Sequence, residues 1–345
     1  WCEECGSALA EAEVEYADKE SKAIDFLFPI KPDQLKDIFK TISSENVFVA
    51  SWTTTPWTIP SNKAICFNSK FTYELIELKF KGKILNLIIC SDLIEATLER
   101  YELDNYTKLG KVTGDKLSGL ICDHPFLDQK SPLISGDHVT QEMGTGFVHT
   151  APAHGLEDYE ACKDLGFDLT SPVKGDGKFR DNISFVGGQT IKEANENVID
   201  LLSEKSLLMA NKKYFHSVST CWRHKIPLFY RATPQWFISM KKSDLLENSE
   251  SMIEEINWLP DWGKSRISAM MTDRPDWCVS RQRTWGVPIP LVIHKETGEL
   301  HKDTLEIIDR IAKKVETEGV EAWFSEDIKD LLVKDYEEYE KVTDI

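Results

Sequence analysis

The chain of 345 residues is 41% hydrophobic and 29% charged, values that exclude a disordered chain, a collagen and a coiled coil. No apolar run approaches the length of about 18 residues that a membrane-spanning helix needs, so we expect no membrane partner. The net charge of −17 argues against a protein that coats nucleic acid, because phosphate binding depends on Lys and Arg. The chain starts at Trp1 without a charged, apolar leader, and its abrupt ends suggest a piece of a longer protein.

Two pairs of metal-ligating residues stand far apart in the chain. Cys2 and Cys5 form a C-x-x-C knuckle, and Cys221 and His224 form a C-x-x-H pair. Together they offer the four ligands of a closed tetrahedral zinc site, and both thiolate and imidazole suit zinc. The alternative is one pair of ordinary buried cysteines and a separate surface Cys-His pair, because C-x-x-C often arises by chance. A Zn²⁺ ion here would clip two distant strands together.

Short strands dominate the first half of the chain. Lys81-Gly82-Lys83 predicts a hairpin turn in which glycine supplies the positive φ, and Ser91 is placed to cap a helix that runs to about Arg100. β-branched and aromatic residues predict strands over 48–51, 63–67, 73–80, 84–90, 117–123 and 146–150.

Helices are fewer, and their ends carry recognisable signals. Gly166 follows the first predicted helix (155–165) as a C-terminal glycine. Thr190 and Glu193 form a capping box at the start of the second (190–202). In the last predicted helix (303–316), apolar residues on one face indicate an amphipathic surface helix. The predicted helices span residues 155–165, 190–202 and 303–316. Since strands do not alternate with helices before about residue 205, a barrel-like or sandwich-like sheet is favoured over a doubly wound one.

A threonine-rich loop is the first candidate site. Thr53, Thr54 and Thr55 precede Trp57 and Asn62, and two prolines in the run stiffen its backbone. Such a loop presents several hydroxyls on a rigid frame, which suits the binding of a ribose or the positioning of a water. The alternative is a strand end rich in β-branched residues.

A second candidate segment follows Gly144. His149 lies on a predicted short strand, His154 follows in the next loop, and Asp158 lies in the first turn of a predicted helix. Ionisable groups at loop ends are where sites usually lie. An acid in a first helical turn is also favoured by the helix dipole, and a strand histidine can be an ordinary core residue.

A third candidate segment carries two arginines. Arg281 and Arg283 alternate along one extended run, so both are expected on one face, suited to a phosphate or an RNA backbone. The alternative is a solvated edge strand. Residues 212–283 carry 12 Lys and Arg against 8 Asp and Glu, so any contact with a polyanion is expected there.

Taken in order, these segments resemble the isoleucyl-tRNA synthetases of bacterial type, which are class I aminoacyl-tRNA synthetases. The runs 53–58 (TTTPWT) and 144–155 (GTGFVHTAPAHG) with Asp158 resemble the two signatures of that family's editing domain, and 221–224 (CWRH) and 280–286 (SRQRTWG) resemble its return to the catalytic core. In the valyl and leucyl relatives the threonine pair is typically followed by Arg-Pro, and the valyl enzymes typically carry Lys where His149 stands.

The resemblance implies an α+β fold: a β-barrel-like editing domain with flanking helices on a zinc-ribbon-like stem, plus a partial α/β catalytic-core segment. The ATP-site signatures of the family are absent, so ATP and Mg²⁺ are expected to serve only the parent enzyme, and this chain alone should not charge tRNA. The implied parts are a stem (1–35 and 206–235), the editing domain (36–205), a core segment (236–292) and the start of a second insertion (293–345).

The resemblance also implies post-transfer proofreading, the hydrolysis of valine mistakenly esterified to isoleucine tRNA. Asp158 would hold the ammonium group, His149 would narrow the pocket against isoleucine, and Thr54 and Thr55 would hold the terminal ribose and the attacking water. Further substrate contacts are expected from Thr53, Trp57, Asn62, His154, Arg281 and Arg283.

The expected partners are the acceptor end of the tRNA and the rest of the synthetase chain, in a cytoplasmic monomer. One alternative is a zinc-stabilised tRNA-binding module without catalysis. The other is the valyl or leucyl counterpart.

Overall fold

A computed structural model of the chain describes residues 1–42, 45–272, 274, 276–283, 285–332 and 334–345. The chain divides into two compact units, Trp1–Thr233 and Pro234–Ile345, and each is described by itself. No helix among the described residues has both the length and the apolar character needed to cross a membrane.

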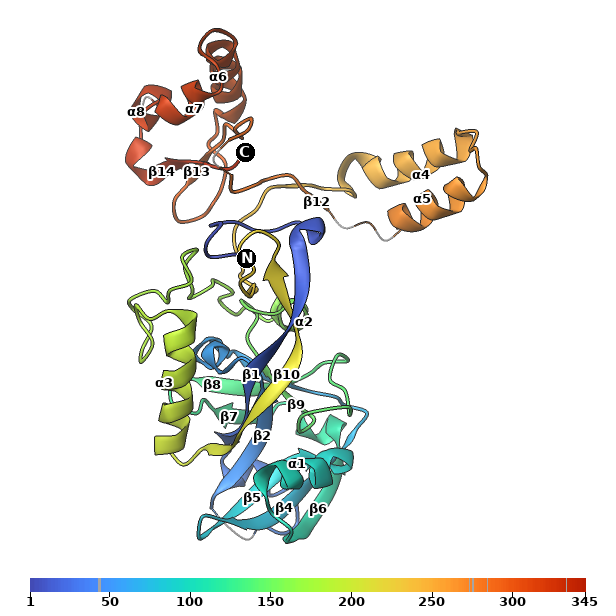
Figure 1. The fold of residues 1–345 in the computed structure, drawn as a ribbon, viewed down its shortest axis with the longest axis vertical. Coiled ribbons are helices and arrows are strands. Elements are labelled where there is room, and N and C mark those ends of the chain that lie inside the picture. Colours follow the sequence, from blue (N-terminus) through green and yellow to red (C-terminus); the bar gives the residue numbers. More distant parts are fainter. Residues whose placement is uncertain (43–44, 273, 275, 284, 333) are drawn as a thin grey trace. The chain divides into compact units, whose positions relative to one another are not determined.

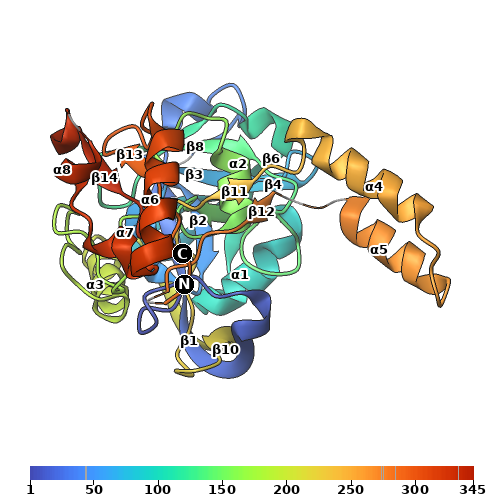
Figure 2. The same cartoon turned by 90° about the horizontal axis from the view of Figure 1, so that it is seen from above.

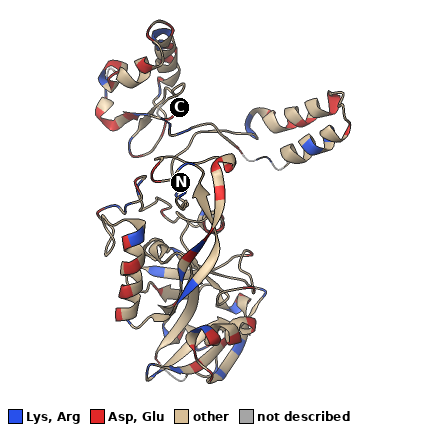
Figure 3. Ribbon diagram, viewed as in Figure 1, with Lys and Arg blue, Asp and Glu red and all other residues tan. Residues whose placement is uncertain are grey.

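A long two-stranded ribbon organises the first unit (Figure 1). Strand β1 (Val14–Pro29) pairs antiparallel with β10 (Leu208–Cys221). Val14 lies opposite Cys221 at the outer end, and the pairing continues from there toward the core. The outer half of β1 is largely exposed, whereas its inner half lies in the core. Acidic and basic residues are interleaved along the ribbon (Figure 3), so its outer half lacks the apolar alternation that predicts a strand from sequence.

The larger sheet of this unit has the strand order β10-β1-β2-β5-β4-β6. Its pairs are antiparallel except β2 with β5, which run parallel. The hairpin between β4 and β5 turns at Lys81 and Gly82, and Gly82 has the positive φ that the sequence predicts. Lys81 also has a positive φ. The remaining strands are β2 (Val47–Thr53), β4 (Thr72–Phe80), β5 (Lys83–Cys90) and β6 (Tyr106–Thr113).

A smaller sheet has the order β7-β8-β3-β9. An isolated bridge between Ile30 and Cys122 joins it to the ribbon, and the Ser51 hydroxyl of β2 both donates to Phe147 O (3.2 Å) and accepts from the His149 N–H (3.1 Å) of β9. The expected barrel-like domain is therefore corrected to two open sheets, the smaller of which contacts interior strands of the larger one. The strands are β3 (Ala64–Phe67), β7 (Ile121–Asp123), β8 (Lys130–Ser135) and β9 (Phe147–Thr150).

The helices of the first unit follow most of the predicted signals. Thr190 and Glu193 form the predicted capping box at the start of α3 (Ile191–Glu204). Helix α2 spans Leu156–Cys162, and α1 spans Ile94–Tyr101. The prediction that Ser91 caps α1 is wrong, because a 3-10 turn (Ser91–Leu93) intervenes and Leu93 takes the cap position.

One hydrophobic core underlies both sheets and helix α3 of this unit. Its largest fully buried side chains include Phe26, Phe28, Tyr73 and Phe147. Short 3-10 helices connect the larger elements at Glu11–Glu13, Pro32–Leu35, Pro56–Ser61 (η3) and Gly114–Leu117.

The second unit contains a helical hairpin and a small mixed subdomain. Helices α4 (Leu245–Glu255) and α5 (Trp262–Thr272) lie side by side (Figures 1 and 2). In the subdomain, Ile307 and Ile311 of α6 pack with the buried Trp323, which confirms an amphipathic helix in this region. Its other elements are α6 (Thr304–Glu318), α7 (Glu321–Ser325), α8 (Ile328–Leu331), β13 (Val292–His294) and β14 (Tyr339–Lys341).

Candidate functional site

The threonine-rich loop begins where β2 ends. The Thr55 N–H donates to Thr53 Oγ1 (3.1 Å), and the two hydroxyl oxygens lie 3.2 Å apart. Pro56 then starts the 3-10 helix η3, in which the Thr58 hydroxyl donates to Thr55 O (2.9 Å). The loop therefore turns back on itself, so that the hydroxyls of Thr53, Thr55 and Thr58 lie in a row. Thr55 is exposed and Thr54 is half-buried, so both are accessible to a ligand.

His149 of β9 lies beneath this row. Its Nε2 is 3.0 Å from Thr58 Oγ1, and its Nδ1 is 2.8 Å from Asn62 Nδ2. The side chain is buried, and burial lowers the pKa of His149 to about 3. The imidazole is therefore neutral near pH 7, and both of its nitrogens are occupied. It is unsuited to act as a general base.

Asp158 is held against the turn that follows β9. Its Oδ2 accepts a hydrogen bond from the Ala151 N–H (2.8 Å), and Gly155 caps the start of α2 beside it. A side chain at Gly155 would place its Cβ 3.0 Å from Asp158 Cγ, so glycine leaves room for the carboxyl. Burial raises the pKa of Asp158. A carboxylate in partly desolvated surroundings binds an ammonium group more strongly than one in water.

Trp57 and His154 form an aromatic pair beside η3. Their rings meet edge to face, with centroids 4.8 Å apart. His154 Nδ1 donates to Tyr230 O (3.0 Å), so its Nε2 accepts from the Ser61 hydroxyl (3.1 Å). Burial lowers the pKa of His154 to about 4. Trp57 is itself buried, so this pair supports the threonine-rich loop from the protein interior.

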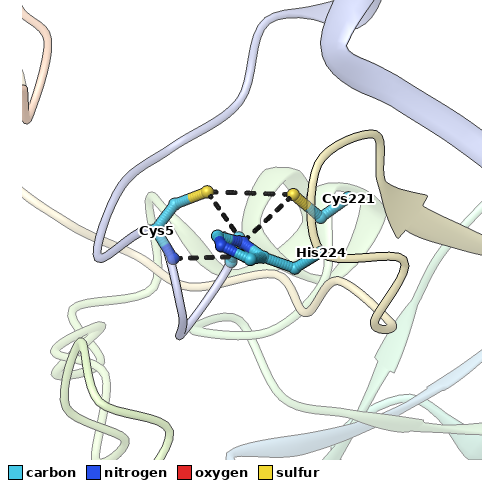
Figure 4. Close-up of side chains that lie close together, drawn as sticks. Cys5, Cys221 and His224 are labelled. Carbon is cyan, nitrogen blue, oxygen red and sulfur yellow. Dashed lines mark hydrogen bonds between the residues drawn. The ribbon is translucent and has the colours of Figure 1, made fainter.

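The structure brings the four predicted metal ligands together at the outer end of the β1–β10 ribbon, and Figure 4 shows three of them, Cys5, Cys221 and His224. Cys5 Sγ lies 3.8 Å from Cys221 Sγ and 3.3 Å from His224 Nδ1, and all four ligand atoms lie within 4.8 Å of one another. Zinc–sulfur bonds of about 2.3 Å in a tetrahedron place two sulfurs about 3.8 Å apart. The Cys5 N–H also points at Cys2 Sγ (3.4 Å). The donor set and its spacing fit zinc.

The two predicted arginines lie in the second unit. Among the described residues between 274 and 290, Trp277–Cys278 (β12) is the one strand, and it pairs with Phe237–Ile238 (β11). The run around Arg281 and Arg283 forms no strand in its described residues, and the placement of both arginines on one face stays a prediction. The Arg281 guanidinium folds back to donate to Ser280 O (2.7 Å) and Cys278 O (3.2 Å).

The basic stretch does not form an unpaired positive surface on the ribbon. Lys213 lies 3.0 Å from Glu20, and Lys225 lies 2.6 Å from Glu15. These ion pairs reduce the field that a polyanion would meet there.

Sequence reasoning missed several groups that the fold places beside the site. Ser131 of β8 lies 2.6 Å from Asn62, and Thr58 joins His149 to the loop. Arg100 of α1 binds Asp25 of β1 through two hydrogen bonds and donates to Gly144 O (2.9 Å). For Thr58 the sequence offered one signal, the threonine-rich composition of residues 53–58. Nothing in the sequence indicates that Ser131 pairs with Asn62 or that Arg100 pairs with Asp25.

Comparison with known proteins gives concordant results. A family model described as "tRNA synthetases class I (I, L, M and V)" matches residues 1–345. Two proteins named "Isoleucine--tRNA ligase", from Francisella tularensis subsp. tularensis (strain WY96-3418) and subsp. novicida (strain U112), are each 50% identical over 329 residues. These matches cover 95% of this chain and 35% of each relative. The chain thus spans about a third of the length of the curated relatives it matches.

Two solved structures also resemble part of the chain. One is titled "The crystal structure of GlLeuRS-CP1" (TM-score 0.43, 13% identity, covering 55% of this chain and 99% of that one). The other is the editing domain of the P. falciparum cytosolic leucyl-tRNA synthetase (TM-score 0.41, 8% identity, covering 56% and 99%).

Proposed function

Because the chain belongs to the class I tRNA synthetases of the I, L, M and V group, we propose that its first unit is an editing site that hydrolyses valine esterified to isoleucine tRNA. Valine lacks one methylene of isoleucine, and this very pair is the standard case in which binding alone discriminates too weakly and a second, hydrolytic site is needed. The observation that carries the proposal is the row of threonine hydroxyls fixed over a neutral, buried His149, in one unit with Asp158.

Asp158 would bind the ammonium group of the esterified amino acid. Its carboxylate is held by the Ala151 N–H and lies in partly desolvated surroundings, which strengthens a charge-assisted hydrogen bond. His149 would limit the size of the side chain that enters, since two hydrogen bonds hold its ring rigidly.

Hydrolysis would proceed by direct attack of water. Burial keeps His149 and His154 neutral and both histidines are already hydrogen-bonded, so neither offers a free base. Thr54 and Thr55 would instead hold the terminal ribose and the attacking water, with positioning as the main source of rate. Thr53, Trp57, Asn62 and His154 would support them.

Cys2, Cys5, Cys221 and His224 would hold a Zn²⁺ ion. When bound there, zinc would act structurally, because four protein ligands fill its coordination sphere and leave no position open to a substrate. The site lies where β10 ends at Cys221. It would therefore fix the N-terminal loop to the far end of the ribbon.

The division into parts follows from the same proposal. Residues 36–205 would form the editing domain, 1–35 and 206–235 the stem, 236–292 a segment of the catalytic core, and 293–345 the start of a second insertion. The parent enzyme would ligate isoleucine to its tRNA with ATP and Mg²⁺ as a cytoplasmic monomer. Arg281 and Arg283 would contact RNA in that context.

The decisive experiment measures ester hydrolysis by this chain with isoleucine tRNA charged either with valine or with isoleucine. Selective release of valine is expected, and Asp158→Ala should abolish it. Glu157→Ala is the matched control, because Glu157 lies in the same helical turn but is exposed.

Three results would contradict the proposal. Binding of tRNA without turnover by a folded chain would instead identify a zinc-stabilised binding module. Release from valine or leucine tRNAs in preference to isoleucine tRNA would identify the valyl or leucyl counterpart. Normal hydrolysis by Asp158→Ala would refute the role of that carboxylate.

A further inference from the structure

A continuous series of hydrogen bonds runs from the buried Ser131 of strand β8 to the exposed end of the threonine loop. It joins Ser131, Asn62, His149, Thr58 and Thr55 in that order, and we call it the β8 relay. The first four of these side chains are buried, whereas Thr55 is exposed. The relay therefore connects the protein interior to the point where a substrate would arrive.

The orientation of the Asn62 amide is fixed from two sides. The Ser131 hydroxyl lies 2.6 Å from Asn62 Oδ1 and donates to it, because an amide oxygen only accepts. On the other side Asn62 Nδ2 donates to Ala64 O at 2.7 Å. A flipped amide would place its oxygen against that carbonyl oxygen. The second N–H of the amide is directed at His149 Nδ1 (2.8 Å), which is nearer than the other acceptor within reach, Thr150 O (3.4 Å).

This orientation determines the tautomer of His149. Its Nδ1 lies 2.8 Å from an amide N–H, so it must be the unprotonated, accepting nitrogen. The proton of the neutral ring is then on Nε2. Nε2–H points at Thr58 Oγ1, 3.0 Å away, and donates to it.

The tautomer in turn decides what Thr58 can do. Its single hydroxyl hydrogen is donated to Thr55 O (2.9 Å), and it accepts from His149. Toward Thr55 Oγ1, at 3.5 Å, Thr58 can therefore only accept. That contact is long, as hydrogen bonds at unliganded sites often are. In that contact Thr55 is the donor, and Thr53 Oγ1, 3.2 Å away, is the other acceptor within reach of the Thr55 hydrogen.

We propose that Thr58 is a positioning residue of the hydrolytic site, locked as an acceptor by the His149 tautomer that Ser131 and Asn62 impose. Thr55 then presents a lone pair outward and accepts a hydrogen from the attacking water or from a ribose hydroxyl. A water that donates to Thr55 directs its own lone pair elsewhere, toward the ester carbon. This inference rests on the proposed function for its catalytic meaning, but its hydrogen-bond pattern is testable alone.

The first test is the tautomer of His149, read from imidazole ¹⁵N chemical shifts and N–H couplings in the ¹⁵N-labelled chain near pH 7. The expected result is an unprotonated Nδ1 and a protonated Nε2. A proton on Nδ1 would overturn the proposal. This measurement needs no substrate, so it stands even if the chain releases no valine.

The second test is kinetic, with valine-charged isoleucine tRNA as the probe. Thr58→Val keeps the volume of the side chain and removes its hydroxyl. We expect kcat for valine release to fall about 10- to 100-fold with little change in KM, because misplacement of reacting groups carries costs of that order. Thr58→Ser, which keeps the hydroxyl, should stay within about threefold of the unchanged chain.

Controls separate positioning from stability. Thr107→Val makes the same change at an exposed position of β6 and should leave kcat unchanged. Ser131→Ala tests the far end of the relay and Ser135→Ala, exposed on the same strand, is its control. Within one relay the effects of Thr58→Val and Ser131→Ala should be non-additive. Full activity of Thr58→Val, or a change confined to KM, would overturn the proposal.

Discussion

Replacing Arg100 with methionine should destabilise the first unit strongly, and more so at neutral than at acidic pH. The Asp25 carboxylate is only 2% exposed, and Arg100 binds both of its oxygens, Nε to Oδ2 at 2.9 Å and Nη2 to Oδ1 at 2.8 Å. Arg100→Met leaves that carboxylate buried without its counter-charge. Breaking a buried pair in this way typically costs about 3–5 kcal/mol.

The pH dependence follows from the pKa of Asp25. Burial raises this pKa, and Arg100 counteracts the effect only in part. Because the folded-state pKa lies above the unfolded-state value, ionisation of Asp25 costs stability as the pH rises through that range. Without Arg100 the folded-state pKa rises further. The deficit of the variant should therefore be largest near pH 7 and shrink as Asp25 becomes protonated at lower pH.

The assay is urea unfolding of the unchanged chain and the variant, followed by tryptophan fluorescence, at pH 7 and at pH 4.5. Asp25→Leu combined with Arg100→Met should recover much of the loss, because an apolar pair of similar volume needs no counter-charge. Lys70→Met, which removes an exposed partner of Asp137, is the control and should have no measurable effect. A loss below about 1 kcal/mol at pH 7, or one independent of pH, would refute the reasoning.

Three further outcomes are expected. Metal analysis of the purified chain should find about one zinc ion per chain. Cys221→Ser or a chelator should lower the thermal midpoint of unfolding of the chain. A metal-free chain of equal stability would contradict the zinc site. Burial lowers the pKa values of His149 to about 3 and of His124 to about 4, so the stability that depends on their neutral forms is complete above pH of about 6.5 and is lost toward pH 3. Urea midpoints that stay constant across that window would argue against buried neutral histidines. Thr190→Ala removes the cap of α3 and should lower the free energy of unfolding by about 1 kcal/mol, whereas an unchanged denaturation midpoint would show that the cap contributes nothing.

Several local features of this protein follow from its sequence, although the cap of α1 does not. The capping box at Thr190, the hairpin at Gly82 and the strands around them depend on interactions within a few residues, so the sequence signals are sufficient. The four metal ligands could also be grouped in advance, because spacing within each pair and the chemistry of thiolate and imidazole limit the choices. The two ligand pairs are more than 200 residues apart in the chain. They were expected to come together only because a tetrahedral ion needs four donors.

Tertiary structure alone decided how the candidate site is built. The β1–β10 ribbon, the open sheets and the contact between Ser131 and Asn62 join segments distant in sequence, and no local pattern encodes which distant strands pair. The protonation state of His149 is likewise a product of burial and two partners. From sequence it could be named as a site residue. Only its surroundings in the fold make it a neutral donor to Thr58, because desolvation and hydrogen bonding act through space and not along the chain.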